Sequence, residues 1–223
     1  MFTVELFDRD LRRRGRIPTH TGSCVIRRNG AGTFQLDIPP TQLWNRFEPG
    51  WHITLTTDDG QQILSGQPDT ITTESKAGIR TVTVSGRSHL AWLADTITLP
   101  NPKNPADKQT DAASWTAKGP ADQVAHNIIT SHLGPTAHHT HRRPITIEPV
   151  EGIGHPTQIA SRFQPLIDEV RSILADNLVI TSWLENAAIH LSITPPSDYH
   201  RRIRLSEADR KSTRLNSSHV SES

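Results

Sequence analysis

The sequence predicts a strand-rich α+β fold, in which a small antiparallel β-barrel or sandwich is followed by a smaller α+β domain. Three observations predict it. Apolar and polar residues alternate through the first hundred residues, as in half-buried strands. Three prolines then fall within residues 100–105, and the sequence after them mixes helical and strand periods. We therefore expect domains at 1–100 and 119–208, joined by an exposed proline-rich connector at 101–118.

The N-terminal domain is predicted to contain about six short strands, with turn residues at regular intervals. In the first strand Phe2, Val4 and Leu6 share one face, and residues 58–60 form a hairpin signal. One helix is expected at Pro40–Phe47, because proline suits the first helical position and apolar residues follow at helical spacing. The other strands are expected at Ser23–Arg28, Gly32–Ile38, Trp51–Thr57, Gln62–Thr73 and Ile79–Gly86. This spacing is typical of small barrels and sandwiches.

The second domain is predicted to run helix, strand, helix and β-hairpin. Its first helix begins at about Gly119 and ends near Leu133, where Gly134-Pro135 stops it. A strand at Pro144–Pro149 and a helix at Gln164–Ala175 follow. Leu178–Leu184 and Ala187–Ile193 then form a hairpin around residues 185–186. This order of elements defines an α+β domain.

Residues 209–223 are expected to be foreign to the natural protein. They show no apolar period, and the first eleven match the in-frame translation of a common short-read sequencing adapter. A disordered tail is the simpler interpretation, but a match over eleven residues favours adapter sequence. We therefore expect the second domain to be truncated near residue 208.

Composition excludes several classes of function. The net charge is +1, with 24 basic and 23 acidic residues, and residues 209–223 carry that excess. A neutral chain has no long-range attraction for nucleic acid. The single cysteine, Cys24, excludes a disulfide framework and a multi-cysteine zinc site. The opening residues enter a strand pattern at once, so no signal peptide is expected.

Histidines are the most conspicuous candidates for metal binding. The chain has 12 of them, and His138, His139 and His141 are clustered. Imidazole is a common ligand for zinc and nickel. However, adjacent residues of a loop point apart, and glycine and proline residues flank the cluster. We favour an exposed loop and keep the three histidines as weak metal candidates.

No catalytic site or cofactor site is predicted within residues 1–208. There is no Gly-x-Ser-x-Gly and no phosphate-binding glycine loop. Asp168 and Glu169 are adjacent on a predicted helix, so they point in different directions. Residues 12–14 are three arginines in the connection after the first strand, where we expect them to face water.

The tryptophans are predicted to pack in cores or between subunits. The four that we single out lie beside apolar strand or helix positions: Trp44, Trp51, Trp92 and Trp115. A sugar-binding platform is the alternative interpretation.

Several segments, taken in order, resemble a family of actinobacteriophage (siphovirus) minor tail proteins of the tail tip or baseplate hub. The strongest is Val82–Asp95, which resembles the family's strand, glycine and short helix carrying Leu-Ala-Trp-Leu. The others are Phe2–Asp10, Gly32–Pro39, Ile63–Gly66, Gly119–Asp122 and Arg162–Leu166. The resemblance covers nearly all of residues 1–208.

The resemblance implies a virion structural protein with no catalytic residues. Its implied partners are other tail proteins, namely the distal tail and tape-measure proteins, with a homo-oligomeric ring for which a trimer is favoured. It implies indirect contact with the host surface and no specific nucleic-acid binding. The alternative is the N-terminal part of a tail-associated cell-wall hydrolase, or of a carbohydrate-binding adhesin, whose active domain lies downstream.

Overall fold

The computed structural model describes residues 2–19, 21–39, 48–76, 79–175 and 177–196. The expected helix Pro40–Phe47, with Trp44, and the segment 209–223 lie outside the described residues.

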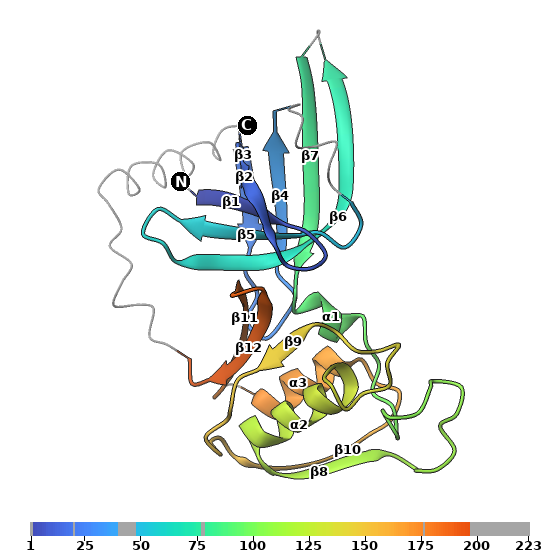
Figure 1. Ribbon diagram of the computed structural model, residues 1–223. Helices are drawn as coiled ribbons and strands as arrows, with labels where there is room; N and C mark the ends of the chain where they lie inside the picture. The colour runs from blue at the N-terminus through green and yellow to red at the C-terminus, as the bar shows by residue number, and fades with distance from the viewer. Residues whose placement is uncertain (1, 20, 40–47, 77–78, 176, 197–223) are drawn as a thin grey trace, which may run out of the picture.

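An open, seven-stranded antiparallel sheet forms the N-terminal part (Figure 1). Its order is β2-β1-β5-β6-β7-β4-β3. The strands are β1 (Phe2–Phe7), β2 (Arg13–Ile17), β3 (Thr21–Val25), β4 (Thr33–Ile38), β5 (His52–Thr57), β6 (Gln62–Lys76) and β7 (Ile79–Ser88). All six ladders are antiparallel.

The sequence predicted a barrel or a sandwich, and a closed barrel is not found, because no ladder among the described residues joins the edge strands β2 and β3. The sequence interpretation also placed the arginines of 12–14 in a connection, whereas Arg13 begins β2. There Arg13 donates to Glu5 at 2.8 Å, and Arg14 forms an ion pair with Asp8. Charged side chains are typical of sheet edges that do not pair further.

The sheet coils where β6 passes from β5 to β7. Residues 62–66 of β6 pair with β5, and pairing with β7 begins at Gly66. A bulge follows at Pro68, which has no N–H to donate. A Cβ at Gly66 would lie 2.2 Å from the Arg87 carbonyl oxygen, and one at Gly86 would lie 2.1 Å from that of Gln67. Only glycine permits this backbone approach, and the far end of β6–β7 projects as a long hairpin (Figure 1).

One face of this sheet carries the first core. Its buried members come from six strands: Val4, Leu6, Ile17, Phe34, Leu36, Ile38, Ile53, Leu55, Leu64, Val82 and Val84. Alternate positions of β4, Phe34, Leu36 and Ile38, are all buried. The alternation predicted from the sequence thus creates this core.

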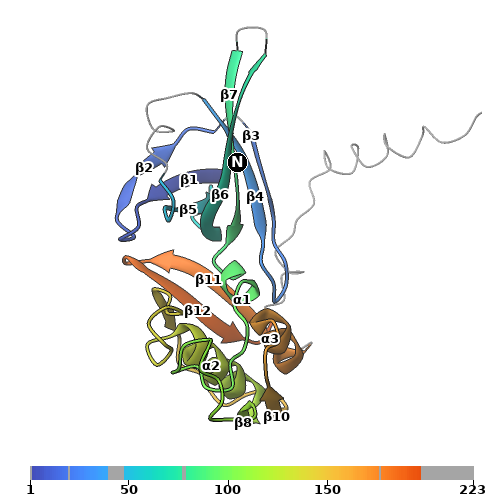
Figure 2. The same cartoon turned by 90° about the vertical axis from the view of Figure 1, so that its right-hand side faces the viewer.

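The C-terminal part is built in layers (Figure 2). A three-stranded sheet, β11-β12-β9, lies toward the N-terminal sheet, and a two-stranded ribbon, β8-β10, covers the far side of the helices. The elements are α1 (Ala91–Ala94), β8 (Trp115–Pro120), α2 (Ala121–Leu133), β9 (Ile145–Ile147), β10 (Pro156–Ser161), α3 (Leu166–Leu174), β11 (Val179–Glu185) and β12 (Ala188–Thr194). The strand-rich α+β prediction is confirmed. The ribbon β8-β10 was not predicted, because few of its residues are apolar.

Helices α2 and α3 supply most of the second core. Val124, Ile128 and Ile129 of α2 are at most 1% exposed, as are Leu166 and Val170 of α3. Leu90 and Leu93, on either side of Trp92, belong to the same core. Helix α1 therefore packs with the C-terminal part, although the predicted domain boundary lies after it.

The proline-rich segment is folded around one side chain. Gln109 is 7% exposed, and its amide nitrogen donates to the carbonyl oxygens of Asn101, Asn104 and Pro105 at 2.9–3.3 Å. Its Oε1 accepts from the Asn101 N–H at 2.8 Å. Pro102 is buried as well. The segment is therefore ordered around Gln109, although many of its other residues are exposed.

Candidate functional site

Two side-chain amides fasten the N-terminal sheet to β11. Asn29 donates to the Leu178 carbonyl oxygen at 3.0 Å and accepts from the Ile180 N–H at 2.9 Å. Gln62, at the start of β6, likewise donates to the Leu184 carbonyl oxygen at 3.1 Å and accepts from the Leu184 N–H at 2.8 Å. Each amide therefore imitates one rung of a β-ladder, and together they fix the hairpin against the sheet.

Asn29 suits this position because of its backbone conformation. It lies in a turn with φ of 52°, a left-handed conformation that asparagine tolerates better than most residues. Its carbonyl oxygen accepts from Arg171 Nε of α3 at 2.8 Å. A Cβ at Gly30 would lie 2.6 Å from the guanidinium of Arg171. The turn thus contacts both β11 and α3.

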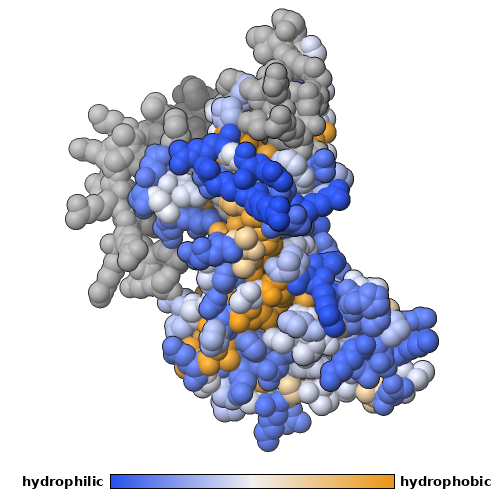
Figure 3. Space-filling model, viewed as in Figure 1, coloured by the Kyte–Doolittle hydropathy of each residue, from blue (hydrophilic) through white to orange (hydrophobic). Residues whose placement is uncertain are grey.

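Apolar packing closes the remainder of the junction. Phe7 and Leu11 of the N-terminal part form a buried cluster with Leu184 and Ile189 of the hairpin, against which Trp92 packs. Figure 3 shows apolar residues gathered in a band between the two parts. Because this cluster lies beside the Gln62 clamp, the junction combines directed hydrogen bonds with desolvated area.

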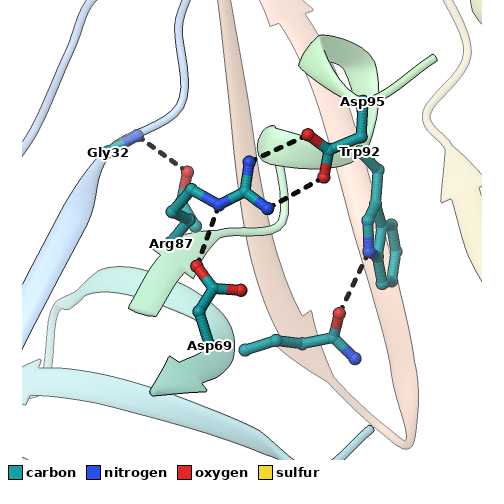
Figure 4. Close-up of polar contacts among 7 residues, drawn as sticks. Gly32, Asp69, Arg87, Trp92 and Asp95 are labelled. Atoms are coloured by element: carbon teal, nitrogen blue, oxygen red, sulfur yellow. Dashed lines mark hydrogen bonds and ion pairs between the residues drawn. The ribbon is translucent and has the colours of Figure 1, made fainter. Parts of the chain in front are cut away.

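Arg87 connects β6, β7 and α1 (Figure 4). Its guanidinium binds both carboxylate oxygens of Asp95 at 2.9 Å and one of Asp69 at 2.9 Å. The hydrogen bonds to Asp95 contribute most to raising the pKa of Arg87, and the bond to Asp69 contributes next. The arginine side chain is 40% exposed, so this bidentate pair orients α1 more than it stabilises the fold.

A chain of hydrogen bonds runs through the buried side of the junction. The Trp92 indole donates to Gln67 Oε1 at 3.1 Å, and Gln67 Nε2 lies 3.5 Å from His52 Nε2. His52 Nδ1 lies 2.8 Å from His89 Nε2, and His89 Nδ1 lies 2.9 Å from Ser65 Oγ. His52 and His89 are 3% and 2% exposed, and Ser65 is fully buried.

The indole sets the direction of the whole chain. Because Trp92 can only donate, it fixes the Gln67 oxygen, and the Gln67 nitrogen must then donate to His52 Nε2. His52 therefore carries its proton on Nδ1 and donates to His89. His89 in turn carries its proton on Nδ1 and donates to Ser65. Both imidazoles are neutral in this arrangement.

These hydrogen bonds therefore do not activate Ser65 as a nucleophile. A serine nucleophile must give its proton to a basic imidazole nitrogen, whereas Ser65 Oγ accepts a hydrogen bond from the protonated Nδ1 of His89. Burial lowers the pKa of His52 to about 4, opposed by the charge of Asp8. Burial, and then His52, hold the pKa of His89 well below its usual value. The cluster is a structural network that requires both imidazoles to be neutral.

The three clustered histidines lie in the loop after α2. The His138 ring centroid is 4.1 Å from that of His139 and 6.0 Å from that of His141, and His138 Nδ1 lies 2.9 Å from Thr140 Oγ1. Within the described ranges, no three His, Cys, Asp or Glu side chains are grouped so that they could hold a metal ion. Among all described residues, every helix is too short or too polar to span a membrane.

Three of the four described tryptophans pack against a core, and the fourth, Trp183, stacks on His190. Trp51 lies against the N-terminal core, and Trp92 and Trp115 against the C-terminal one. Trp115 meets His132 edge to face at 5.8 Å between ring centroids. Trp51, Trp92 and Trp115 each remain partly exposed.

The sequence analysis assigned no role at the junction to the four residues that organise it: Asn29, Gln62, His52 and His89. His52 carried a usable signal, because it stands between apolar residues in a strand where both faces are buried. The amides carried none, since their partners lie 122–151 residues away.

The sequence pattern of one protein family, described as Siphovirus ReqiPepy6 Gp37-like protein, matches residues 3–215. The chain belongs to this family. The predicted resemblance to a siphovirus tail protein family is thereby confirmed. No curated protein matches the chain.

Two solved tail protein structures are similar to this Gp37-like chain, and the first of them shares its fold. The tail protein from Neisseria meningitidis MC58 is 15% identical with a TM-score of 0.52, over 87% of this chain and 52% of that one. The prophage MuSo2 43 kDa tail protein from Shewanella oneidensis is 17% identical with a TM-score of 0.49, over 87% of this chain and 53% of that one. The chain thus spans about half the length of both proteins.

Proposed function

We propose that this chain is a structural component of a phage tail tip or hub. It assembles with other tail proteins, including the distal tail and tape-measure proteins, and serves host attachment and DNA delivery from within the virion. Membership of the Siphovirus Gp37-like family carries the proposal. The fold shared with the Neisseria tail protein supports it.

The junction supports a mechanical role. The two amide clamps, the apolar cluster and the Arg87 pairs bind the two parts at separate points. A part held at several points transmits force as one body, which suits a component that must stay rigid while DNA passes. Among the described residues the serine–histidine contact is directed the wrong way for hydrolysis, so the proposed role is structural rather than enzymatic.

Locating the chain in virions tests the proposal. Antibody labelling of purified phage particles, viewed by electron microscopy, is expected to mark the end of the tail distal to the head. A capsid-directed antibody serves as the control for label position. Label along the tail tube or on the head, or particles that lack the protein, would overturn the tip assignment.

The oligomeric part of the proposal is a homo-oligomeric ring, with a trimer favoured. The partly exposed residues Trp51, Trp92 and Trp115 are proposed to contact neighbouring subunits, because aromatic residues are enriched at interface centres. Light scattering after gel filtration is expected to give the mass of a trimer. A chain that stays monomeric at high concentration and retains neither the distal tail nor the tape-measure protein contradicts assembly. The hydrolase and adhesin alternatives stay predictions.

A further inference from the structure

The buried hydrogen-bond network that runs from Trp92 to Ser65 lies between the two parts of the molecule. His52 and Ser65 belong to strands of the N-terminal sheet, whereas Trp92 belongs to α1, which packs with the C-terminal core. His52 lies opposite Phe7 in the β1–β5 ladder, and Phe7 packs against the β11–β12 hairpin. The network is therefore part of the contact between the two parts.

His89 stands where the described chain passes from one part to the other. It follows β7, the last strand of the N-terminal sheet, and α1 begins two residues after it (Figure 1). Its N–H donates to the Ser65 carbonyl oxygen at 3.0 Å, and its carbonyl oxygen accepts from the Trp92 N–H at 3.1 Å. Within the described residues the backbone crosses between the parts only here. A few residues at such a crossing absorb a hinge motion, so His89 occupies the position of a hinge.

Protonation of either imidazole places two N–H groups against each other. His52 Nδ1 donates to His89 Nε2 across 2.8 Å, so a proton on that Nε2 leaves two donors and no acceptor between the rings. A proton on His52 Nε2 opposes the side-chain N–H of Gln67 in the same way. Both rings are at most 3% exposed, and a buried charge without a partner is costly. The packed junction therefore requires both rings to be neutral.

Asp8 acts on His52 from the turn that follows β1. Its charge favours the protonated imidazole, but the opposing effect of burial on the pKa of His52 is larger. Asp8 also accepts from the Arg12 N–H and forms an ion pair with Arg14. Burial therefore decides the charge of the pair. The elements around it contribute neutral side chains or a charge that is already paired: Ser65 and Gln67 of β6, Trp92 of α1, Leu184 of the hairpin, and Arg87 with Asp69 and Asp95.

We propose that the junction is an acid-operated hinge, in which protonation of His52 and His89 separates the N-terminal sheet from α1 while each part keeps its own core. Three histidines are buried among the described residues, and two of them meet at this junction. The amide clamps at Asn29 and Gln62 are neutral hydrogen bonds, which water replaces at small net cost once the parts separate. The proposal goes beyond the structural role proposed above and does not depend on where the chain lies in a virion.

The direction of the response follows from where the protons bind. In the open form both imidazoles meet water and titrate near the ordinary value of 6.5, whereas in the closed form burial lowers the pKa of His52 to about 4. The open form therefore binds more protons between these values. The closed form is favoured above pH 6.5, and the ratio of open to closed chains rises as the pH falls. His52 alone gives a rise of about 30-fold between pH 8 and pH 5, and His89 adds to it.

Tryptophans stand at the three places that the proposal distinguishes. Trp92 lies in the junction, Trp51 against the N-terminal core and Trp115 against the C-terminal core. The full chain, labelled with 5-fluorotryptophan, is titrated from pH 8 to pH 5 by fluorine NMR, and Trp→Phe variants assign the three resonances. We expect a second, solvent-exposed Trp92 resonance to grow at least 30-fold relative to the folded one. Trp51 and Trp115 are expected to keep their folded resonances.

Protein variants identify the sensor. His52→Asn with His89→Gln removes both ionisable rings, and this variant is expected to hold the open-to-closed ratio within twofold from pH 8 to pH 5. His155→Asn, at an exposed position, is the matched control and is expected to keep the full response. If the double variant does not fold, His52→Asn alone is expected to reduce the rise about 30-fold.

Loss of the acceptor at the end of the network tests the geometry. Ser65→Ala leaves His89 Nδ1 without its acceptor, so the ratio of open to closed chains is expected to rise at least fivefold at every pH. Ser75→Ala, at an exposed position of the same strand, is the control and is expected to leave the ratio unchanged. An unchanged ratio in Ser65→Ala would mean that the network does not hold the junction closed.

Three results of the titration would overturn the proposal. A Trp92 resonance that stays folded down to pH 5 means that the junction does not open. Loss of the folded Trp51 or Trp115 resonance together with that of Trp92 means that acid unfolds a whole part. An unchanged response in His52→Asn places the sensor elsewhere. Trp115 meets the buried His132, whose ionisation would move the Trp115 resonance gradually, whereas unfolding would replace it by the resonance of a solvent-exposed indole.

Discussion

The neutral pair His52 and His89 predicts that acid weakens the fold in a defined pH window. In the unfolded chain a histidine titrates near its ordinary value of 6.5, whereas in the folded chain His52 titrates at about 4. Between these values the unfolded state binds more protons than the folded one. The free energy of unfolding therefore falls as the pH falls from about 6.5 towards 4.

The size of the effect follows from the two pKa values of His52. Integration of the linkage relation over this window gives a loss of about 2 kcal/mol at pH 5 relative to pH 8. The lowered pKa of His89 and of buried His132 adds loss of the same sign. The carboxylates Glu5 and Asp8 have pKa values lowered from 4.5 and 3.8, so their contribution is lost as the pH falls below those values, under the range of pH 5 to 8.

Urea denaturation at pH 5, 6, 7 and 8 measures the effect. His52→Asn keeps a donor near Nδ1 but cannot be protonated. Between pH 8 and pH 5 we therefore expect the free energy of unfolding of this variant to fall by about 2 kcal/mol less than that of the unmodified chain. His155→Asn, at an exposed position, is the matched control and is expected to keep the full slope. A flat profile for the unmodified chain, or equal slopes for His52→Asn and the unmodified chain, would refute the reasoning.

Three further predictions concern stability, each measured by urea denaturation at pH 7. Asn29→Ala leaves two groups of β11 unpaired and puts alanine at positive φ, so it is expected to cost about 2–4 kcal/mol. Asn29→Gly keeps the backbone conformation and is expected to cost about 1 kcal/mol less than Asn29→Ala. Equal losses for the two variants would show that backbone strain does not contribute. Arg87→Lys loses the bidentate pair at a site 40% exposed and is expected to cost less than about 1 kcal/mol, so a larger loss would mean that α1 depends on it. Ile128→Ala empties a fully buried position and is expected to cost about 2–5 kcal/mol; a loss below 1 kcal/mol would place Ile128 outside the core.

Local patterns predicted the elements well where burial is one-sided. The alternation in β4 and the apolar stripe of α2 each report one buried face, and both elements lie where the sequence places them. The hairpin was also predicted, with its turn displaced by one residue to 186–187. Periodicity could not reveal β2, because its outward arginines resemble those of a loop.

Closure of the sheet could not be predicted from local pattern, because it depends on which strands meet. The same short strands suit a barrel, a sandwich or an open coil. The coil here depends on Gly66 and Gly86 at one crossing, and a glycine in a strand does not identify the backbone that will approach it. The proline-rich loop is a similar case, since its order comes from Gln109, four residues beyond the last of its prolines.

The junction between the two parts shows most clearly what local sequence patterns cannot predict. In the sequence, Asn29 in a turn and Gln62 at a strand start are ordinary polar residues. Their role follows from the alternation of the β11 ladder, which turns the N–H and C=O groups that they bind away from β12. An unpaired strand edge attracts other strands, and proteins usually cover such edges. Asn29 and Gln62 cover this one at its two ends, where each amide binds the N–H and C=O groups that a further strand would need.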